Sequence, residues 1–153
     1  MRIDRAERWI AAPADRVYQA LTTRDAVEVW LPPTGARGVI EAFEPRPGGP
    51  FRMTLVFDTP GETGARKSSE TTDTVEGEFL ALTPDVSVRQ RFTFVSDDPA
   101  FAGAMTMTWT LTDEAGGTRV AVAAEDVPPG IRPEDHRQGM ESSLANLARH
   151  VEA

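Results

Sequence analysis

Apolar and polar side chains alternate with a period of two along most of the chain between residues 38 and 125. In residues 105–111, MTMTWTL, every second residue is methionine, tryptophan or leucine, and the others are threonine. Successive side chains of a strand point to opposite faces, so this pattern predicts strands with one apolar face. Turn-forming residues separate six such segments, which we expect to form an antiparallel sheet: residues 38–43, 51–57, 73–82, 86–94, 105–111 and 118–125.

The residues before this region predict one more strand and two short helices. Residues 1–11 are typical of a strand, and a helix is expected to begin at Pro13, because proline suits the first helical turn. A second short helix is expected to end at Trp30, since the Leu-Pro-Pro sequence at 31–33 disfavours helical backbone before each proline. The polar residues 58–72 predict a long hairpin loop between two strands.

The last part of the chain predicts one long helix that begins at Pro133. Met140, Leu144 and Leu147 recur at steps of three or four residues, so they share one face of this helix. Gly139 interrupts the helix at a cost of about 1 kcal/mol relative to alanine. That cost favours close packing of another segment against the helix at this position.

A sheet with one apolar face needs a cover, and the long helix is the only predicted element of sufficient length. We therefore predict an α+β fold with about seven antiparallel strands, two short helices after the first strand and a C-terminal helix over a curved sheet. One helix cannot fill the whole concave face, so an internal cavity is expected, and cavities of roughly 300–1,000 Å³ bind small molecules. No linker or repeat divides the chain, which predicts one domain over residues 1–153.

The composition disfavours several classes of function. The formal net charge is −8 and the pI is near 4.8, so a nucleic-acid backbone would be repelled. The chain has no cysteine, which removes disulfides and thiol catalysis. No apolar run reaches the roughly 20 residues that span a bilayer, and the charged N-terminal segment is unlike a signal peptide. We therefore expect a cytoplasmic protein with no nucleic-acid partner and no membrane insertion.

Four sequence motifs together resemble a known family. They are R-x-I-x-A-P-x-x-x-V-Y-x-A-L-T at 8–22 with Trp30 downstream, RPGGPFRM at 46–53, WTLTDEAGGTRV at 109–120 and G-M-x-x-S-L-x-N-L at 139–147. Their order and spacing resemble the START-like (SRPBCC) superfamily, in the branch named after the activator of heat-shock-protein-90 ATPase, which includes the calicheamicin self-resistance protein. The resemblance implies the helix-grip fold with its internal pocket. The Gly-Trp pair that the family often carries in its last helix is Gly139–Met140 here.

The chain shows no recognisable catalytic or metal-binding constellation. It has neither cysteine nor a G-x-S-x-G sequence for nucleophilic catalysis. Its two histidines, His136 and His150, lie fourteen residues apart on one predicted helix, about 21 Å along the axis, so they cannot share a metal. We therefore expect no metal and no cofactor.

The candidate pocket residues are the inward-facing apolar side chains and two polar ones. Gln90 is the single polar member of an apolar strand face, and a buried amide without a partner costs roughly 1–3 kcal/mol, so we expect it to bind a side chain, a water or a ligand. His136 lies one helical turn before Met140, where it either caps the helix or meets the polar end of a ligand. The full set is Trp30, Phe51, Met53, Leu55, Gln90, Phe92, Met107, Trp109, His136, Met140 and Leu144.

Two residues of the first predicted strand have different expected roles. Arg8 belongs to the R-x-I-x-A-P motif, and we expect it to pair with an acidic residue on a neighbouring strand. Trp9 is expected on the opposite strand face from Ile10, as an exposed contact or an edge cover.

Three functions are compatible with these observations. The first is binding of a small apolar or aromatic molecule without covalent chemistry. The second, implied by the resemblance, is interaction with a chaperone ATPase; the co-chaperone's stimulating region includes another domain that we do not find here, so we expect no large stimulation. The third is a cyclase or hydrolase that uses polar pocket groups such as His136, Gln90 or Arg8. We favour them in that order, and an enzyme is the least favoured.

Overall fold

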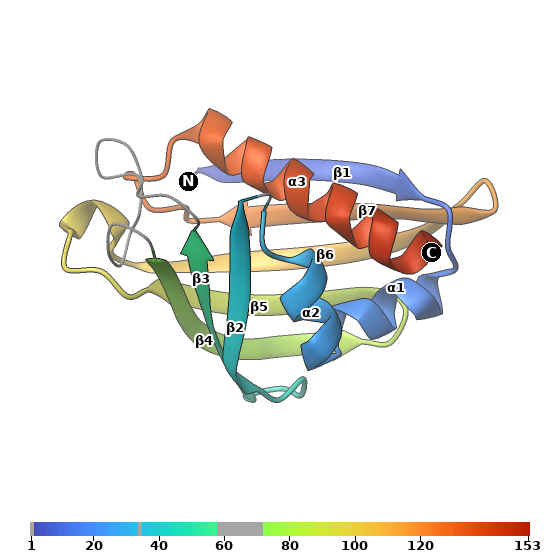
Figure 1. The fold of residues 1–153 in the computed structure, drawn as a ribbon, viewed down its shortest axis with the longest axis horizontal. Helices are drawn as coiled ribbons and strands as arrows, with labels where there is room; N and C mark the ends of the chain where they lie inside the picture. The colour runs from blue at the N-terminus through green and yellow to red at the C-terminus, as the bar shows by residue number, and fades with distance from the viewer. Residues whose placement is uncertain (1, 34, 58–71) are drawn as a thin grey trace.

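A seven-stranded antiparallel sheet forms the body of the protein, in the order β1-β7-β6-β5-β4-β3-β2 (Figure 1). The computed structural model describes residues 2–33, 35–57 and 72–153. It confirms the predicted α+β helix-grip arrangement; of the predicted hairpin loop, residues 58–71 lie outside the described residues. The strands are β1 (Ile3–Ile10), β2 (Ala36–Phe43), β3 (Pro50–Phe57), β4 (Thr72–Thr83), β5 (Ser87–Phe94), β6 (Ala104–Glu114) and β7 (Gly117–Glu125).

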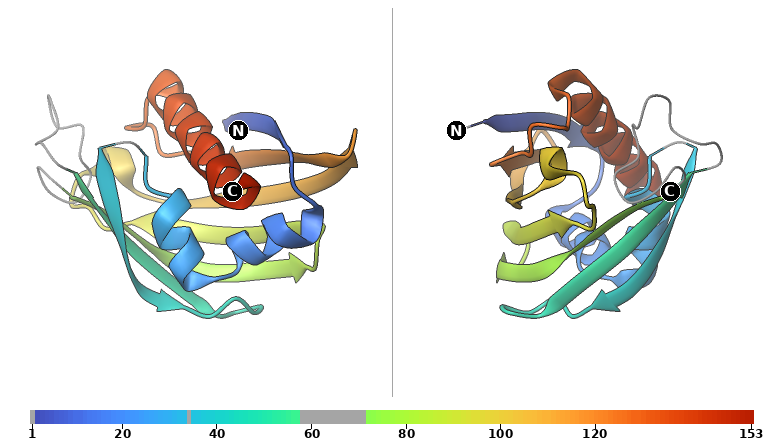
Figure 2. Two further views of the ribbon diagram at one scale, coloured as in Figure 1. Left: turned by 45° about the vertical axis from the view of Figure 1, so that its right-hand side comes forward. Right: turned by 90° about the vertical axis from the view of Figure 1, so that its left-hand side faces the viewer.

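The helices lie together on the concave side of the sheet, which curves around them (Figure 2). They are α1 (Ala14–Leu21), α2 (Arg24–Trp30) and α3 (Pro133–Glu152), and a short 3-10 turn, η2 (Pro99–Phe101), precedes β6. α3 crosses the strand β1 and also contacts α1 and α2. The face of α3 that carries Met140, Leu144 and Leu147 is buried, as its spacing predicts.

Trp30 joins the short helices to the sheet. Its side chain is almost completely buried, and its indole Nε1 donates a hydrogen bond of 2.8 Å to Ala20 O at the end of α1. The ring lies edge-on to Trp109 of β6, with centroids 5.3 Å apart and an interplanar angle of 83°. The edge-to-face arrangement is favourable for aromatic pairs, so this contact fixes where α2 meets the sheet.

Two polar side chains of α3 hold the proline-rich segment that follows α2. Ser143 Oγ donates to Leu31 O at 2.7 Å, and Asn146 Nδ2 donates to Pro32 O at 2.9 Å. Both residues belong to the motif at 139–147. Their role is to satisfy carbonyl groups that the end of α2 leaves without helical partners.

Gly77 allows two aromatic rings to meet on the floor of the concave face. It is the cross-strand neighbour of both Phe51 and Phe92, whose ring centroids are 5.1 Å apart. A Cβ at this position would run into the backbone of Arg91 and the Cα of Phe92. Glycine is therefore required here by close approach of the backbone.

Gly139 does not have the packing role that the sequence suggested. A Cβ added at this position would meet no atom within 4 Å outside its own helix backbone, so no segment is packed closely against it. The expectation of close packing was wrong, because the apolar stripe that α3 buries passes through the adjacent Met140 and leaves Gly139 at its margin.

We expect Gly139→Ala to raise the free energy of unfolding by about 1 kcal/mol, since alanine forms helices better than glycine and the added methyl group meets no obstacle. Gly77→Ala is the matched comparison and should lower stability, because its methyl group overlaps neighbouring backbone. Urea denaturation of both variants measures the two changes. A loss of stability in Gly139→Ala would contradict the open environment described for this residue.

Candidate functional site

An internal cavity lies where α1 and α2 meet the concave face of the sheet. Its volume is about 40 Å³. Side chains from both helices, from β3, β5 and β6, and from the segment after α2 line it: Leu21, Val27, Trp30, Leu31, Phe51, Val88, Gln90, Phe92, Met107 and Trp109. The structure thus brings together Trp30, Phe51, Gln90, Phe92, Met107 and Trp109 of the predicted pocket set.

The cavity is much smaller than the volume we expected of a ligand pocket. About 30 Å³ is the share of one molecule in liquid water, whereas pockets for small molecules measure roughly 300–1,000 Å³. The reason is the size of the surrounding side chains, since Trp30 and Trp109 pack against each other and Phe51 packs against Phe92. Admission of a ligand therefore requires side chains to move.

Gln90 is the polar group of this cavity. The residue is 7% exposed, and its cross-strand neighbours are Phe79 on β4 and Met107 on β6. Within the described residues, the side-chain amide of Gln90 forms no hydrogen bond, and the indole N–H of Trp109 donates none. A buried amide without a partner is rare in native proteins and costs about 1–3 kcal/mol, so Gln90 is an exception in this core that calls for an explanation.

Met107 stands between the cavity and a second group of apolar residues. It is only partly buried although it faces the concave side, and it packs against both the main core and a smaller cluster around Phe101 and Ile131. Its neighbours toward that end of the sheet, Val75 and Phe94, are also only partly buried. Methionine adapts its shape easily, so movement of Met107 is the simplest way to enlarge the cavity.

Other predicted pocket residues lie outside the cavity lining. Met53, Met140 and Leu144 are buried in the main core, and Leu55 packs against it with part of its side chain exposed. The Met53 side chain fills the space over Gly38, where a Cβ would overlap it. These residues support the shape of the concave face rather than border the cavity.

The structure places His136 at β1, away from this cavity. Its Nδ1 lies 2.8 Å from Asp4 Oδ2, and Arg2 makes two further hydrogen bonds to the same carboxylate, at 2.8 and 3.1 Å. Burial raises the pKa of Asp4, but the hydrogen bonds and charges of Arg2 and His136 outweigh it, so the pKa lies below its ordinary value. This cluster ties the start of α3 to the first strand.

Four lining residues were absent from the predicted set: Leu21, Val27, Leu31 and Val88. Leu21 and Val88 each belong to an apolar stripe visible in the sequence. Only the tertiary arrangement shows that the end of α1 and the start of β5 face the same space.

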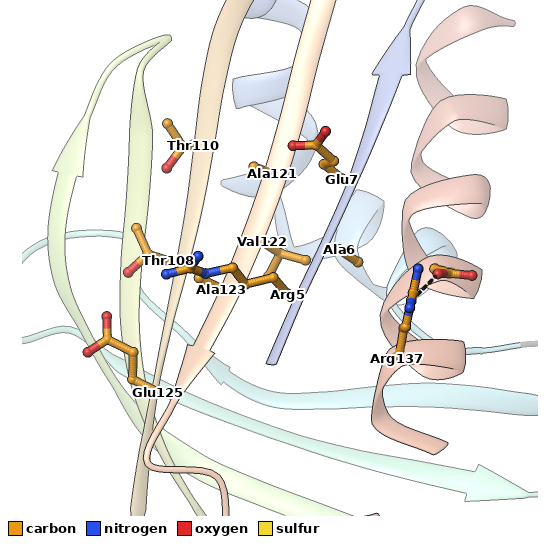
Figure 3. A pocket seen from close by; sticks show the side chains of 11 residues that line it. Arg5, Ala6, Glu7, Thr108, Thr110, Ala121, Val122, Ala123, Glu125 and Arg137 are labelled. Carbon is orange, nitrogen blue, oxygen red and sulfur yellow. Dashed lines mark hydrogen bonds and ion pairs between the residues drawn. The ribbon is translucent and has the colours of Figure 1, made fainter. Parts of the chain in front are cut away.

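A second, open hollow of about 520 Å³ lies around β1. Figure 3 shows Arg5 and Glu7 of β1 beside Thr108, Thr110, Ala121 and Ala123 on the convex face, and Arg137 of α3 on the far side of β1. The small side chains of β6 and β7 account for the depression. Because its lining includes both the convex face and α3, the hollow reaches past the free edge of β1.

The described residues contain no group of three or more His, Asp or Glu side chains placed to hold a metal ion. Among the helices described, none combines the length and apolar character that crossing a membrane requires.

The family model described as "Activator of Hsp90 ATPase homolog 1-like protein" matches residues 11–152. The chain belongs to this family. The match agrees with the START-like resemblance of the four motifs, and the departure within the family motif, Met140 in place of tryptophan, is a buried core residue in this member.

Solved structures similar to this family member come from several bacteria. A protein of Chromobacterium violaceum is 28% identical, with a TM-score of 0.85 over 100% of this chain and 99% of that one. A protein of Mesorhizobium loti is 23% identical (TM-score 0.73, covering 99% and 97%), and an AHSA1 protein of Silicibacter pomeroyi is 19% identical (TM-score 0.78, covering 99% and 98%). No curated protein sequence matches the chain.

We expect Asp4→Asn to lower stability at neutral pH by about 1.5–3 kcal/mol, the range for hydrogen bonds to charged groups. Folding lowers the pKa of Asp4 below its ordinary value of 3.8. The stability that the Asp4 carboxylate contributes is therefore fully present above pH 3.8 and is lost as the pH falls through the lowered pKa. Urea denaturation of both proteins from pH 7 to pH 3 measures the difference. Asp97→Asn, at an exposed loop residue, is the control; a difference that stays constant with pH would contradict the ion-pair cluster.

Proposed function

We propose that the protein binds a small apolar or aromatic molecule that carries one hydrogen-bonding group, in an enlarged form of the cavity beside Gln90. The observation that supports the proposal is the buried, unpartnered Gln90 amide among aromatic walls. A ligand that hydrogen-bonds this amide removes a cost of about 1–3 kcal/mol, so molecules with one polar group should bind more tightly than plain hydrocarbons.

The chemistry of the lining supports a flat, mostly apolar ligand. An amide offers both a donor and an acceptor, so a hydroxyl or carbonyl group suits it equally. The rings of Trp30, Phe51 and Trp109 favour an aromatic body, which packs edge-on or offset against them. Rotation of Met107 provides the space.

Binding without covalent chemistry accounts for the site better than catalysis does. Gln90 is the only non-aromatic polar side chain among the ten that line the cavity. An amide does not exchange a proton near neutral pH and is not a nucleophile. His136, the acid–base candidate from the sequence, hydrogen-bonds Asp4 at β1 instead.

The test compares two probes of the same shape, naphthalene and 2-naphthol, by titration calorimetry. We expect 2-naphthol to bind about tenfold more tightly, since one hydrogen bond contributes about 1 kcal/mol or more. Gln90→Leu should remove this preference and leave naphthalene binding in place. Gln138→Leu makes the same replacement on the exposed side of α3 and should retain the preference.

Equal affinity of the wild-type protein for the two probes would exclude Gln90 as a ligand contact. A preference that persists in Gln90→Leu would place the polar contact elsewhere, and the absence of saturable binding by both probes would refute the proposed function.

The stability of Gln90→Leu tests whether the amide has a partner inside the folded chain. Replacing an unpartnered buried amide with an apolar side chain of similar size removes the desolvation cost, so the free energy of unfolding should stay equal or rise by about 1–2 kcal/mol. Thermal and urea denaturation measure it. A loss of more than about 1 kcal/mol would show that the amide has a partner within the folded chain.

A further inference from the structure

The two ends of the sheet differ in how their free edges are covered. At β2, Arg24 and Glu28 of α2 bond the backbone carbonyl and N–H of Ile40, so the helix occupies this edge. At β1, the hollow extends from the convex face around the strand to Arg137 on α3 (Figure 3). Within the part of the chain that the structure describes, the edge of β1 is therefore open along its middle.

The open edge presents an ordered set of backbone groups. Asp126 donates its N–H to Arg2 O at 3.0 Å, and β1 pairs with β7 without a bulge from Ile3 to Ile10. Hydrogen-bonded and non-bonded pairs alternate along an antiparallel ladder. The N–H and C=O groups of Ile3, Arg5, Glu7 and Trp9 consequently point away from β7, toward the open edge.

Most charged side chains of β1 other than Asp4 have weak ion-pair contacts or none. Among the described residues, Arg5 and Arg8 have no ion-pair partner, although a partner was expected for Arg8. Glu7 makes only a 3.8 Å contact with Arg119. Ile3 and Trp9 are 36% and 38% exposed, two of the large apolar residues that the surface displays.

We propose that β1 pairs with β1 of a second copy of this chain, antiparallel and centred on Ala6, so that two sheets join into one. In this register Arg5 lies opposite Glu7 of the second copy, and Ile3 lies opposite Trp9, on the convex face. Asp4 lies opposite Arg8 on the concave face. Twofold symmetry makes every one of these contacts twice.

The charges select this register over its neighbours. A shift of two residues in one direction places Arg5 opposite Arg5 of the second copy, and a shift in the other places Glu7 opposite Glu7. Like charges directly opposite each other are destabilising, whereas opposite charges stabilise a pair of strands. A shift of one residue would set the convex face of one sheet against the concave face of the other.

Charged side chains on an edge strand usually prevent association, because a partner strand places like charges together. The order of signs in the sequence IDRAERW at 3–9 has the reverse effect, since it is complementary to itself when read antiparallel. In the pair the unpartnered Arg5 gains the carboxylate of Glu7, whereas Asp4, which lies opposite Arg8, already binds Arg2 and His136.

Sedimentation velocity tests the proposal. At about 0.1 mM, well above a micromolar Kd, we expect a species of twice the 16.7 kDa chain mass. Arg5→Glu and Glu7→Arg should each weaken self-association about tenfold or more, because each turns two attractive contacts into repulsive ones. Arg37→Glu, the same charge change on the opposite edge strand, is the control and should have no effect.

Mixing the two weakened variants separates specific pairing from net charge. In the mixture, the new carboxylate at position 5 of one variant faces the new guanidinium at position 7 of the other. The unchanged Glu7 of the first variant likewise faces the unchanged Arg5 of the second, so a heterodimer should form while each variant alone stays monomeric. A monomeric wild-type protein at this concentration, or self-association that survives in both single variants, would overturn the proposal.

A cysteine at position 6 tests the register independently of charge. The chain has no cysteine of its own, and residues opposite each other in a non-bonded antiparallel pair have Cα atoms about 4.5 Å apart, within the range of a disulfide. Mild oxidation of Ala6→Cys should yield a covalent dimer. Val39→Cys, at an exposed residue of β2, should yield little, and equal cross-linking of the two variants would count against pairing at β1.

Discussion

One apolar face of a seven-stranded sheet has to be removed from water, and the packing of the helices against it governs the rest of the structure. α3 covers part of the face, and α1 and α2 cover the part that α3 does not reach. The contact between Trp30 and Trp109 holds α2 against the sheet, because Trp30 is the last residue of α2 and its ring packs edge-on against a ring of β6. Both rings also line the cavity, so its size depends on how they pack.

The same packing leaves Gln90 as a polar side chain among apolar neighbours. A polar side chain in the middle of β5 interrupts an otherwise apolar face, and neither cross-strand neighbour has a hydrogen-bonding group of suitable strength. A buried amide without a partner among the described residues carries a desolvation cost, and departures of this kind from an apolar core occur mainly at functional sites.

The amino-acid sequence determines some of these features locally and leaves others to long-range packing. Period-two alternation was enough to place the strands, and Gln90 was visible as the exception on its face. The volume of the cavity was not predictable, because it depends on how Trp30, from a separate helix, meets Trp109. The partner of His136 is Asp4, 132 residues earlier in the chain, and no local pattern indicates this pair. The expectation of close packing at Gly139 was wrong for a related reason: in sequence, a glycine at the margin of a buried helix face looks the same as a glycine packed against another segment.

The unequal edges of the sheet have a consequence for the largest assembly that strand pairing can build. A sheet with two open edges adds copies without limit and grows into a fibre. Here α2 occupies the backbone of Ile40 on β2, while β1 is open. The proposed joining through β1 would use the open edge of both copies at once and leave the two β2 edges, each bonded by α2 at Ile40, at the outer ends. In the proposed dimer, growth by edge pairing would therefore stop at two chains, because α2, the helix that borders the cavity, blocks the backbone of Ile40 at each outer edge.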